Sequence, residues 1–403
     1  MKGKKIFSRT VILLSLVSLF NDISSEMLIP VLPAYLSSIG FTALWIGVLE
    51  GLAEAVSGLS KGYFGKLSDS YQHRAPFVRW GYAMSAVSKS MLVLSTFPLW
   101  IFFSRTIERL GKGVRTAARD ALLADESVPA HRGKVFGLNK AMDTLGATAG
   151  AAFAACYLYF FPGNYRNLFL IAFVPAVVAV ALTFVIRERA KETKTWKGFR
   201  NAFSFFGYWK KSTPSYKKLV AGFLLFALFN SSDAFIFLVG KHLGLSDSMV
   251  LTAYIFYNLV FALLALPFGH LADKLGMKKT YLVGIIFFGI AYFLFPWASS
   301  PAIYFLAFFA YAFYAASTDG ISKAWISNNC HAGEKATALG FYSGVQSIVI
   351  LLSNLLAGLL WSISSPETLF LVSAGGAILT LWYFYFYSPV ENRDSSIQSG
   401  FSA

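Results

Sequence analysis

Charged side chains recur inside the apolar stretches of the first 160 residues. They comprise six acids and five bases: Asp22, Glu26, Glu50, Glu54, Glu108, Asp143, Lys89, Arg105, Arg109, Lys112 and Lys140. An isolated charge at the centre of a bilayer costs about 2.5–3.5 kcal/mol, so eleven would cost on the order of 30 kcal/mol. A fold cannot carry that cost. The near balance of signs therefore indicates that most of these groups are paired or line a water-filled cavity.

The spacing of these charges places them on shared helix faces. Asp22 and Glu26 are four residues apart, as are Glu50 and Glu54, so each pair lies on one face of a helix. A longer series falls within about 120° of arc on a helix: Arg105, Glu108, Arg109, Lys112, Arg115 and Arg119. Such a stripe cannot face lipid, and we expect it to face the cavity.

Two interpretations of these charges remain open from the sequence. In the functional one, Arg105, Arg109 and Lys140 bind an anionic group, because guanidinium groups suit carboxylates and phosphates. Asn230 would face the same cavity and contact the substrate. The coupling proton would be carried by carboxylates tuned by burial and neighbouring bases, namely one or more of Asp22, Glu26, Glu50, Glu54, Asp143 and Asp233. In the structural interpretation, the Arg–Glu pairs only fix helices to one another.

The composition is that of an integral membrane protein. Of 403 residues, 56% are hydrophobic and only 14% are charged, and the mean hydropathy is +0.57. Soluble proteins have more charge and less apolar surface. A spanning helix needs roughly 20 apolar residues, so twelve helices with short loops fit the length. The two cysteines, Cys156 and Cys330, exclude a disulfide framework and a cysteine-based metal site.

The apolar stretches divide into two sets of six around a basic segment. We predict an N-terminal six-helix bundle over 1–186, a cytoplasmic linker over 187–217, and a C-terminal bundle with a short tail over 218–403. Predicted cytoplasmic segments contain 23 Lys and Arg, whereas the predicted outer loops contain two, Arg166 and Lys241. This asymmetry places both termini in the cytoplasm. The net charge of +15 therefore reflects membrane orientation, and no nucleic-acid partner is expected.

An internal repeat supports the division into halves. Gly65, Asp69 and Arg74 follow the second apolar stretch, and Gly269, Asp273 and Lys278 follow the eighth, 204 residues later at all three positions. The first and seventh stretches also share Leu-Phe-Asn, at 19–21 and 228–230.

The Gly-x-Leu-[Ala/Ser]-Asp element in both halves resembles the signature of the major facilitator superfamily. This resemblance covers essentially the whole chain and implies an all-α fold of two six-helix bundles that rock around a central site. It also implies a gating role for Gly65, Asp69, Arg74, Gly269, Asp273 and Lys278. A weaker likeness, Gly137, Gly146 and Gly150, is to the glycine pattern of drug–proton antiporters, although Ala151 replaces the usual proline. Small residues that allow close helix packing would give the same pattern.

We therefore expect a proton-coupled secondary transporter of a small organic anion, such as a polycarboxylate or a carboxylate-type siderophore. It would be a monomer in the plasma (inner) membrane of a prokaryote, in contact with lipid. The five histidines fall in predicted loops or at helix ends, so no metal site is expected, and no cofactor or enzyme motif is present. The main alternative is a multidrug–proton antiporter that exports lipophilic cations. More distant alternatives are a lipid flippase, a non-transporting sensor and a membrane-embedded enzyme.

Overall fold

The computed structural model describes residues 6–28, 31–32, 35–36, 39–40, 43–188, 204–245 and 247–387, and its described elements are all helical. The N-terminal half contains α1 (Arg9–Glu26), α3 (Ala43–Tyr71), α4 (Ala75–Leu94), α5 (Pro98–Glu126), α6 (Arg132–Phe160) and α7 (Tyr165–Val185). The C-terminal half contains α9 (Pro214–Phe229), α10 (Asp233–His242), α11 (Asp247–Leu275), α12 (Met277–Leu294), α13 (Pro301–Asn328), α14 (Lys335–Ile363) and α15 (Pro366–Tyr387). With α9 and α10 counted as one span, the described residues form twelve spans, as the hydropathy pattern predicts.

Proline and hydroxyl side chains set where several of these helices begin. Pro98, Pro214 and Pro301 each occupy the first turn of a helix, where the missing N–H costs nothing. Thr213 and Ser300 precede the last two prolines and accept hydrogen bonds from backbone N–H groups of the first turns of α9 and α13. The predicted linker, 187–217, is therefore too long at its C-terminal end. The helix α9 begins at Pro214, and a short helix, α8 (Tyr208–Lys211), precedes it.

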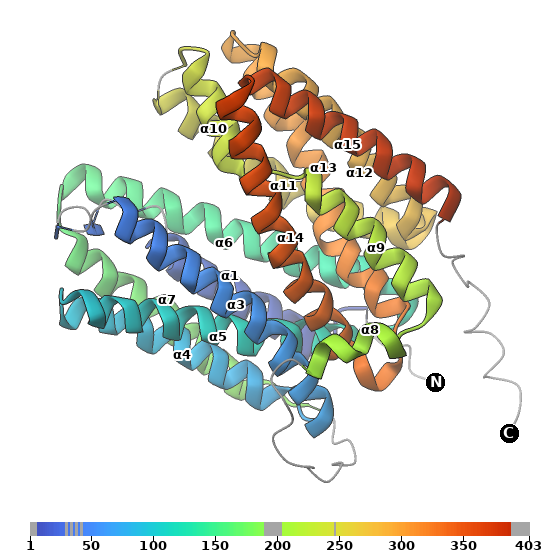
Figure 1. Ribbon diagram of the computed structural model, residues 1–403. Coiled ribbons are helices and arrows are strands. Elements are labelled where there is room, and N and C mark those ends of the chain that lie inside the picture. The colour runs from blue at the N-terminus through green and yellow to red at the C-terminus, as the bar shows by residue number, and fades with distance from the viewer. Residues whose placement is uncertain are drawn as a thin grey trace, which may run out of the picture.

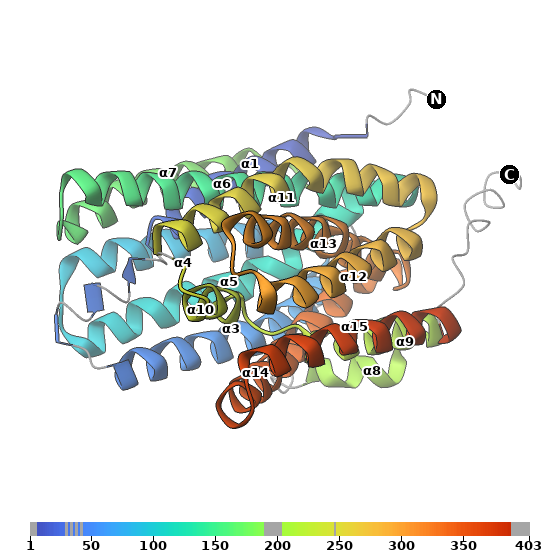
Figure 2. The same cartoon turned by 90° about the horizontal axis from the view of Figure 1, so that it is seen from above.

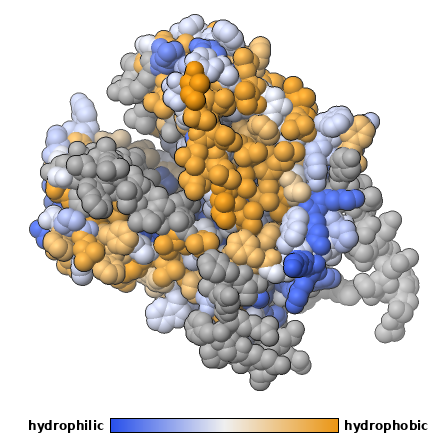
Figure 3. Space-filling model, in the orientation of Figure 1, coloured by the Kyte–Doolittle hydropathy of each residue, from blue (hydrophilic) through white to orange (hydrophobic). Residues whose placement is uncertain are grey.

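The outer surface of the bundle is apolar. Among the described helices, six are long and apolar enough to cross a membrane by length and composition: α7, α11, α12, α13, α14 and α15. On α14 the side chains of Leu351, Leu355 and Ile363 are more than half exposed. Figure 3 shows the apolar band over this helix. Side chains of this kind on an exposed face indicate contact with lipid.

Two spans are interrupted where the sequence predicts continuous helices over 11–37 and 218–240. The helix α1 ends at Glu26, ahead of Pro30 and Pro33 in the sequence, which cannot donate to a helix ladder. The seventh span breaks between Phe229 and Asp233. Side chains of α14 supply partners to the backbone at this break, so the break can lie within the bundle.

The two halves meet at one end of the molecule, which we call the linker end because α7 ends and α9 begins there. Figure 1 shows the blue-to-green half and the yellow-to-red half together near α8 and diverging away from it. The helix α11 packs on α6, and α14 packs on α3, and Figure 2 shows α11 alongside α6. A Cβ on Gly133 or on Gly269 would overlap the carbonyl oxygen of the other residue. The absence of side chains at these two positions therefore permits the closest approach of α6 to α11.

A segment that precedes α9 reinforces this closure. Phe205, in the 3-10 turn before α8, is buried, with only 1% of its surface exposed. Its ring lies against Gly62 of α3 and near Gly344 of α14. The aromatic ring thus fills the space between one helix from each half.

Candidate functional site

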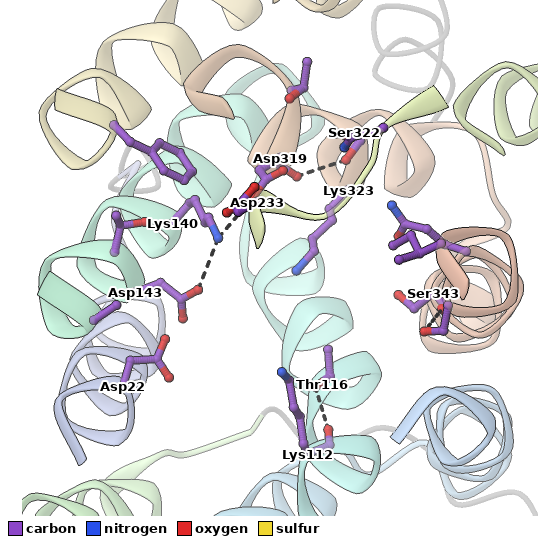
Figure 4. A pocket seen from close by; sticks show the side chains of 18 of the residues that line it. Asp22, Lys112, Thr116, Lys140, Asp143, Asp233, Asp319, Ser322, Lys323 and Ser343 are labelled. Atoms are coloured by element: carbon purple, nitrogen blue, oxygen red, sulfur yellow. Dashed lines mark hydrogen bonds and ion pairs between the residues drawn. The ribbon is translucent and has the colours of Figure 1, made fainter. Parts of the chain in front are cut away.

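A polar cavity of about 600 Å³ lies between the two halves. Helices α1, α5 and α6 line it from the N-terminal half, together with Lys61 of α3, and α9 to α14 line it from the C-terminal half. Figure 4 shows side chains from both halves pointing into the same space. The cavity thus has the position expected for a central substrate site.

The wall from the N-terminal half is the charged one. Five members of the predicted stripe on α5 line the cavity: Glu108, Arg109, Lys112, Arg115 and Arg119. Asp22 and Glu26 of α1 and Lys140 and Asp143 of α6 do so as well. The prediction that α5 turns its charged face to a cavity is confirmed by this arrangement.

Arg105 does not line this cavity, which corrects its predicted contact with a substrate. Its side chain is 2% exposed and forms an ion pair with Glu108, three residues further along α5. Arg105 is the first residue of the stripe and lies one helical turn outside the cavity wall. It contacts Glu108, which does line the cavity. Lys89 of α4 is also buried, and its ammonium donates to Ser24 Oγ at 2.7 Å and Ser25 Oγ at 3.1 Å. Lys89 thus joins α4 to α1, whereas the Arg105–Glu108 pair lies within α5 and does not join two helices.

Two carboxyl groups on the cavity wall face each other. Figure 4 shows Asp22 of α1 pointing towards Asp143 of α6, and both side chains line the cavity. Asn21 Nδ2 donates to Asp22 Oδ1 at 2.9 Å. Two neighbouring carboxyl groups repel each other when both are ionised, so such a pair takes up a proton more readily than a single carboxyl group does. The pair is therefore a site where one proton can be held.

Bases surround Asp143 on its other side. Its oxygens lie 3.6 Å from Lys140 Nζ and 3.8 Å from Arg119 Nη1. An anion that entered beside these bases would compete with Asp143 for them. The geometry thus places a proton site and an anion site in direct contact.

Ion pairs cross from one half to the other at this level. Lys140 of α6 lies 3.1 Å from Asp319 of α13, and Lys323 of α13 lies 2.8 Å from Asp120 of α5. Asp120 also accepts from Arg119 at 3.0 Å and is nearly fully buried. Sequence reasoning did not place Asp120, Asp319 and Lys323 in the site. The repeat offers a signal for one pair, since Asp120 and Lys323 are 203 residues apart, close to the offset of the signature motif.

The aromatic side chains that line the cavity come from the C-terminal half. They are Phe223, Phe226, Tyr254, Tyr257, Phe261, Tyr281, Tyr314 and Tyr342. Lys140 Nζ lies 5.2 Å from the centre of the Phe261 ring, a cation–π distance. Asn230 and Asp233 also line the cavity, as predicted, from the break between α9 and α10.

The first copy of the repeated motif connects α3 to α14 at the linker end. Asp69 accepts hydrogen bonds from the backbone N–H groups of Ala336 (3.3 Å) and Thr337 (2.6 Å), in the first turn of α14. Its carboxylate also lies 2.9 Å from Arg74. Arg74 lies 3.0 Å from Asp125. A carboxylate at a helix N-terminus interacts favourably with the unpaired N–H groups there, so Asp69 holds the two halves together.

The second copy makes the matching contact between α11 and α6. Asp273 accepts from the backbone N–H groups of Gly133 at 2.8 Å and Lys134 at 2.9 Å, in the first turn of α6. Gly269 lies at the close approach of the same two helices, and Gly65 lies against the carbonyl oxygen of Ala336 in the first copy. Lys278 lies in the first turn of α12. We call the contacts of Asp69 and Asp273 the two latches.

The other predicted residues are two glutamates of α3 and the glycines of α6. The side chains of Glu50 and Glu54 lie outside the described residues. Gly146 and Gly150 lie against the backbone of α1, and Gly137 lies against that of α11. The glycine pattern of α6 thus serves close helix packing.

Within the described residues, no cluster of three or more His, Cys, Asp or Glu side chains could hold a metal ion.

Comparisons with known proteins agree with this architecture. The family model described as Major Facilitator Superfamily matches residues 14–256 and 219–403. The chain belongs to the major facilitator superfamily. An uncharacterised transporter of this superfamily from Methanocaldococcus jannaschii is 33% identical over 384 residues, which cover 93% of both chains.

Two further proteins are similar to the chain. The sialic acid transporter NanX of Escherichia coli is 26% identical over 278 residues, covering 66% of this chain and 65% of that protein. The crystal structure of the human organic anion transporter MFSD10 has the same fold, with a TM-score of 0.79 at 17% identity over 93% of this chain and 98% of the other. As a superfamily member, this chain is a multi-pass membrane transporter and not an enzyme.

Proposed function

We propose that this protein is a proton-coupled transporter of small organic anions. The observation that supports this most is the charged wall of the cavity, where Arg119 and Lys140 lie beside Asp143 and Arg109 lines the same wall. Bases that line a water-accessible cavity attract an anion, and Arg suits carboxylates in particular. The similarity to a sialic acid transporter agrees with an acidic substrate. Polycarboxylates, including carboxylate-type siderophores, are the class we favour.

The ion pairs of Asp143 suggest how anion binding and proton binding are linked. An anion that binds Lys140 and Arg119 would displace Asp143 from these bases. The carboxyl pair would then bind a proton more readily, because its compensating positive charge is shared with the substrate. Anion and proton therefore enter together. Since Lys140 also pairs with Asp319 of the other half, the same event would weaken a contact that joins the halves.

The two latches give the proposed gate. Asp69 with Thr337 of α14 and Asp273 with Gly133 of α6 hold the linker end closed, so a substrate reaches the cavity from the opposite end. We propose that these contacts break when the halves 1–186 and 218–403 rock over the substrate. The protein would act as a monomer in the plasma membrane of a prokaryote, with the linker 187–217 in the cytoplasm.

Arg109→Gln is expected to weaken the binding of small carboxylates at least tenfold, because it removes one charge-assisted pair from the cavity. The measurement is the ligand-induced rise in melting temperature of the purified protein with citrate, succinate and benzoate. Arg166→Gln is the matched control, since Arg166 lies exposed at the start of α7, outside the cavity.

A different result would identify a different substrate class. If lipophilic cations such as tetraphenylphosphonium stabilise both the wild type and Arg109→Gln, while no carboxylate does, the acids of the cavity bind the substrate. The anion proposal would then be wrong, and the multidrug antiporter would be the better account.

A further inference from the structure

The break in the seventh span is supported from one side by α14. Ser353 Oγ donates to the carbonyl oxygen of Asn230 at 3.2 Å, and the backbone N–H of Ser232 donates to Asn354 Oδ1 at 2.8 Å. These contacts provide partners for backbone groups that a continuous helix would have satisfied internally. The break is thus held in a defined position on the cavity wall, and it presents Asn230 and Asp233 to the cavity.

Tyrosines of α13 orient these two side chains. Asn230 Nδ2 donates to the hydroxyl of Tyr314 at 2.8 Å, and the hydroxyl of Tyr311 donates to Asp233 Oδ1 at 2.6 Å. Tyr311 and Tyr314 lie one helical turn apart, so they hold Asn230 and Asp233 from the same face of α13. The side chains are therefore fixed before any ligand binds.

One atom in this arrangement lacks a partner. Asn230 Oδ1 is buried and accepts no hydrogen bond from any described residue. A buried acceptor without a donor is unfavourable, and this cost is recovered if a ligand supplies the donor. Asp233 adds a second acceptor three residues away, since only one of its oxygens is used by Tyr311.

We infer that Asn230 and Asp233 form an acceptor subsite, which binds a hydrogen-bond donor on the substrate. This inference rests on the proposed function and extends it: the anion carries a hydroxyl or an ammonium group at the end remote from its carboxylate. The carboxylate lies against the bases of the N-terminal half, and the donor lies against the C-terminal half. A substrate of this type touches both halves at once, and the aromatic side chains of Tyr254 and Tyr257 contact the apolar part between its two polar ends.

The chemistry of the subsite predicts its selectivity. Both available atoms are acceptors, so a substrate that ends in a methyl group or a hydrogen atom would leave Asn230 Oδ1 unpaired. Sites built to bind a hydroxyl or an amine discriminate strongly against analogues that lack it, for this reason. The subsite therefore separates hydroxy acids and amino acids from plain carboxylic acids of the same shape.

Three acids that share the benzoate frame test the subsite: benzoate, 4-hydroxybenzoate and 4-(aminomethyl)benzoate. Their dissociation constants are measured by calorimetry on the purified full-length protein. We expect at least one donor-bearing acid to bind about tenfold more tightly than benzoate, the effect of one well-placed hydrogen bond. Asn230→Leu should abolish this advantage. Asp233→Asn should remove the preference for the ammonium compound while leaving that for the hydroxyl.

Asn258→Leu is the matched control, because Asn258 is another amide on the cavity wall, bonded to the carbonyl of Tyr254 and not part of the break. It should keep the tenfold advantage. Equal binding of all three acids by the wild type, or an advantage that survives Asn230→Leu, would overturn the subsite. In either case, weaker binding of all three acids by Arg109→Gln would leave the proposed function standing. If none of the acids binds, the proposed function fails together with the subsite.

Discussion

Replacing Asp69 by asparagine is expected to raise the alkylation rate of Cys330 by about a hundredfold. Cys330 lies half-buried in the loop between α13 and α14, and this burial raises the pKa of its thiol to about 12. Only the thiolate reacts, so the closed linker end protects Cys330. Asparagine would present an N–H₂ group to the N–H groups of α14 and would leave Arg74 without one of its two carboxylates. The latch would weaken, and solvent exposure of the thiol would return its pKa towards the ordinary range.

The rate is measured with a maleimide on the purified Cys156→Ala protein, in which Cys330 is the one remaining thiol. Gel filtration shows whether each variant is folded. Asp273→Asn is the matched comparison, and we expect a smaller change, because the contacts that the structure gives for Asp273 are two backbone N–H groups and not an arginine. An unchanged rate in a folded Asp69→Asn protein would show that this latch does not hold the linker end closed.

Asp22→Asn is expected to abolish the accumulation of substrate driven by a pH gradient, while exchange of substrate across the membrane continues. Asparagine is close to aspartate in shape and cannot take up a proton, so the carboxyl pair with Asp143 is lost and the bases that bind the anion remain. The measurement compares concentrative uptake with counterflow in proteoliposomes.

Glu26→Gln is the control for this variant, since Glu26 lies one turn further along the same helix and also lines the cavity. It should still accumulate substrate. Accumulation by Asp22→Asn, together with its loss in Glu26→Gln, would move the coupling proton from the carboxyl pair to Glu26.

The sequence was sufficient to predict the charged wall because the α5 stripe follows from helical spacing alone. Five of its six members line the cavity. Arg105 was misplaced because the angle around a helix does not determine how far along the helix the cavity extends. Its side chain is buried beside Glu108 and does not line the cavity.

The contacts between the halves were harder to predict. The repeat gave the positions of Asp69 and Asp273, yet their partners are backbone N–H groups of α14 and α6, which no side-chain pattern reveals. Asp120 and Lys323 meet because α13 of one half contacts α5 of the other. The break at Asn230 depends on side chains of α14 more than 100 residues away. Each of these features depends on tertiary packing, and local sequence does not encode it.

The most direct test of anion–proton coupling is the number of protons taken up when an anion binds. Calorimetry of the tightest-binding carboxylate, repeated at pH 7 in two buffers of different ionisation enthalpy, gives this number. Our account predicts an uptake of about one proton per anion in the wild type and none in Asp22→Asn, because the Asp22–Asp143 pair gains a proton as the anion takes its bases. Anion binding by the wild type with no uptake of protons would contradict it.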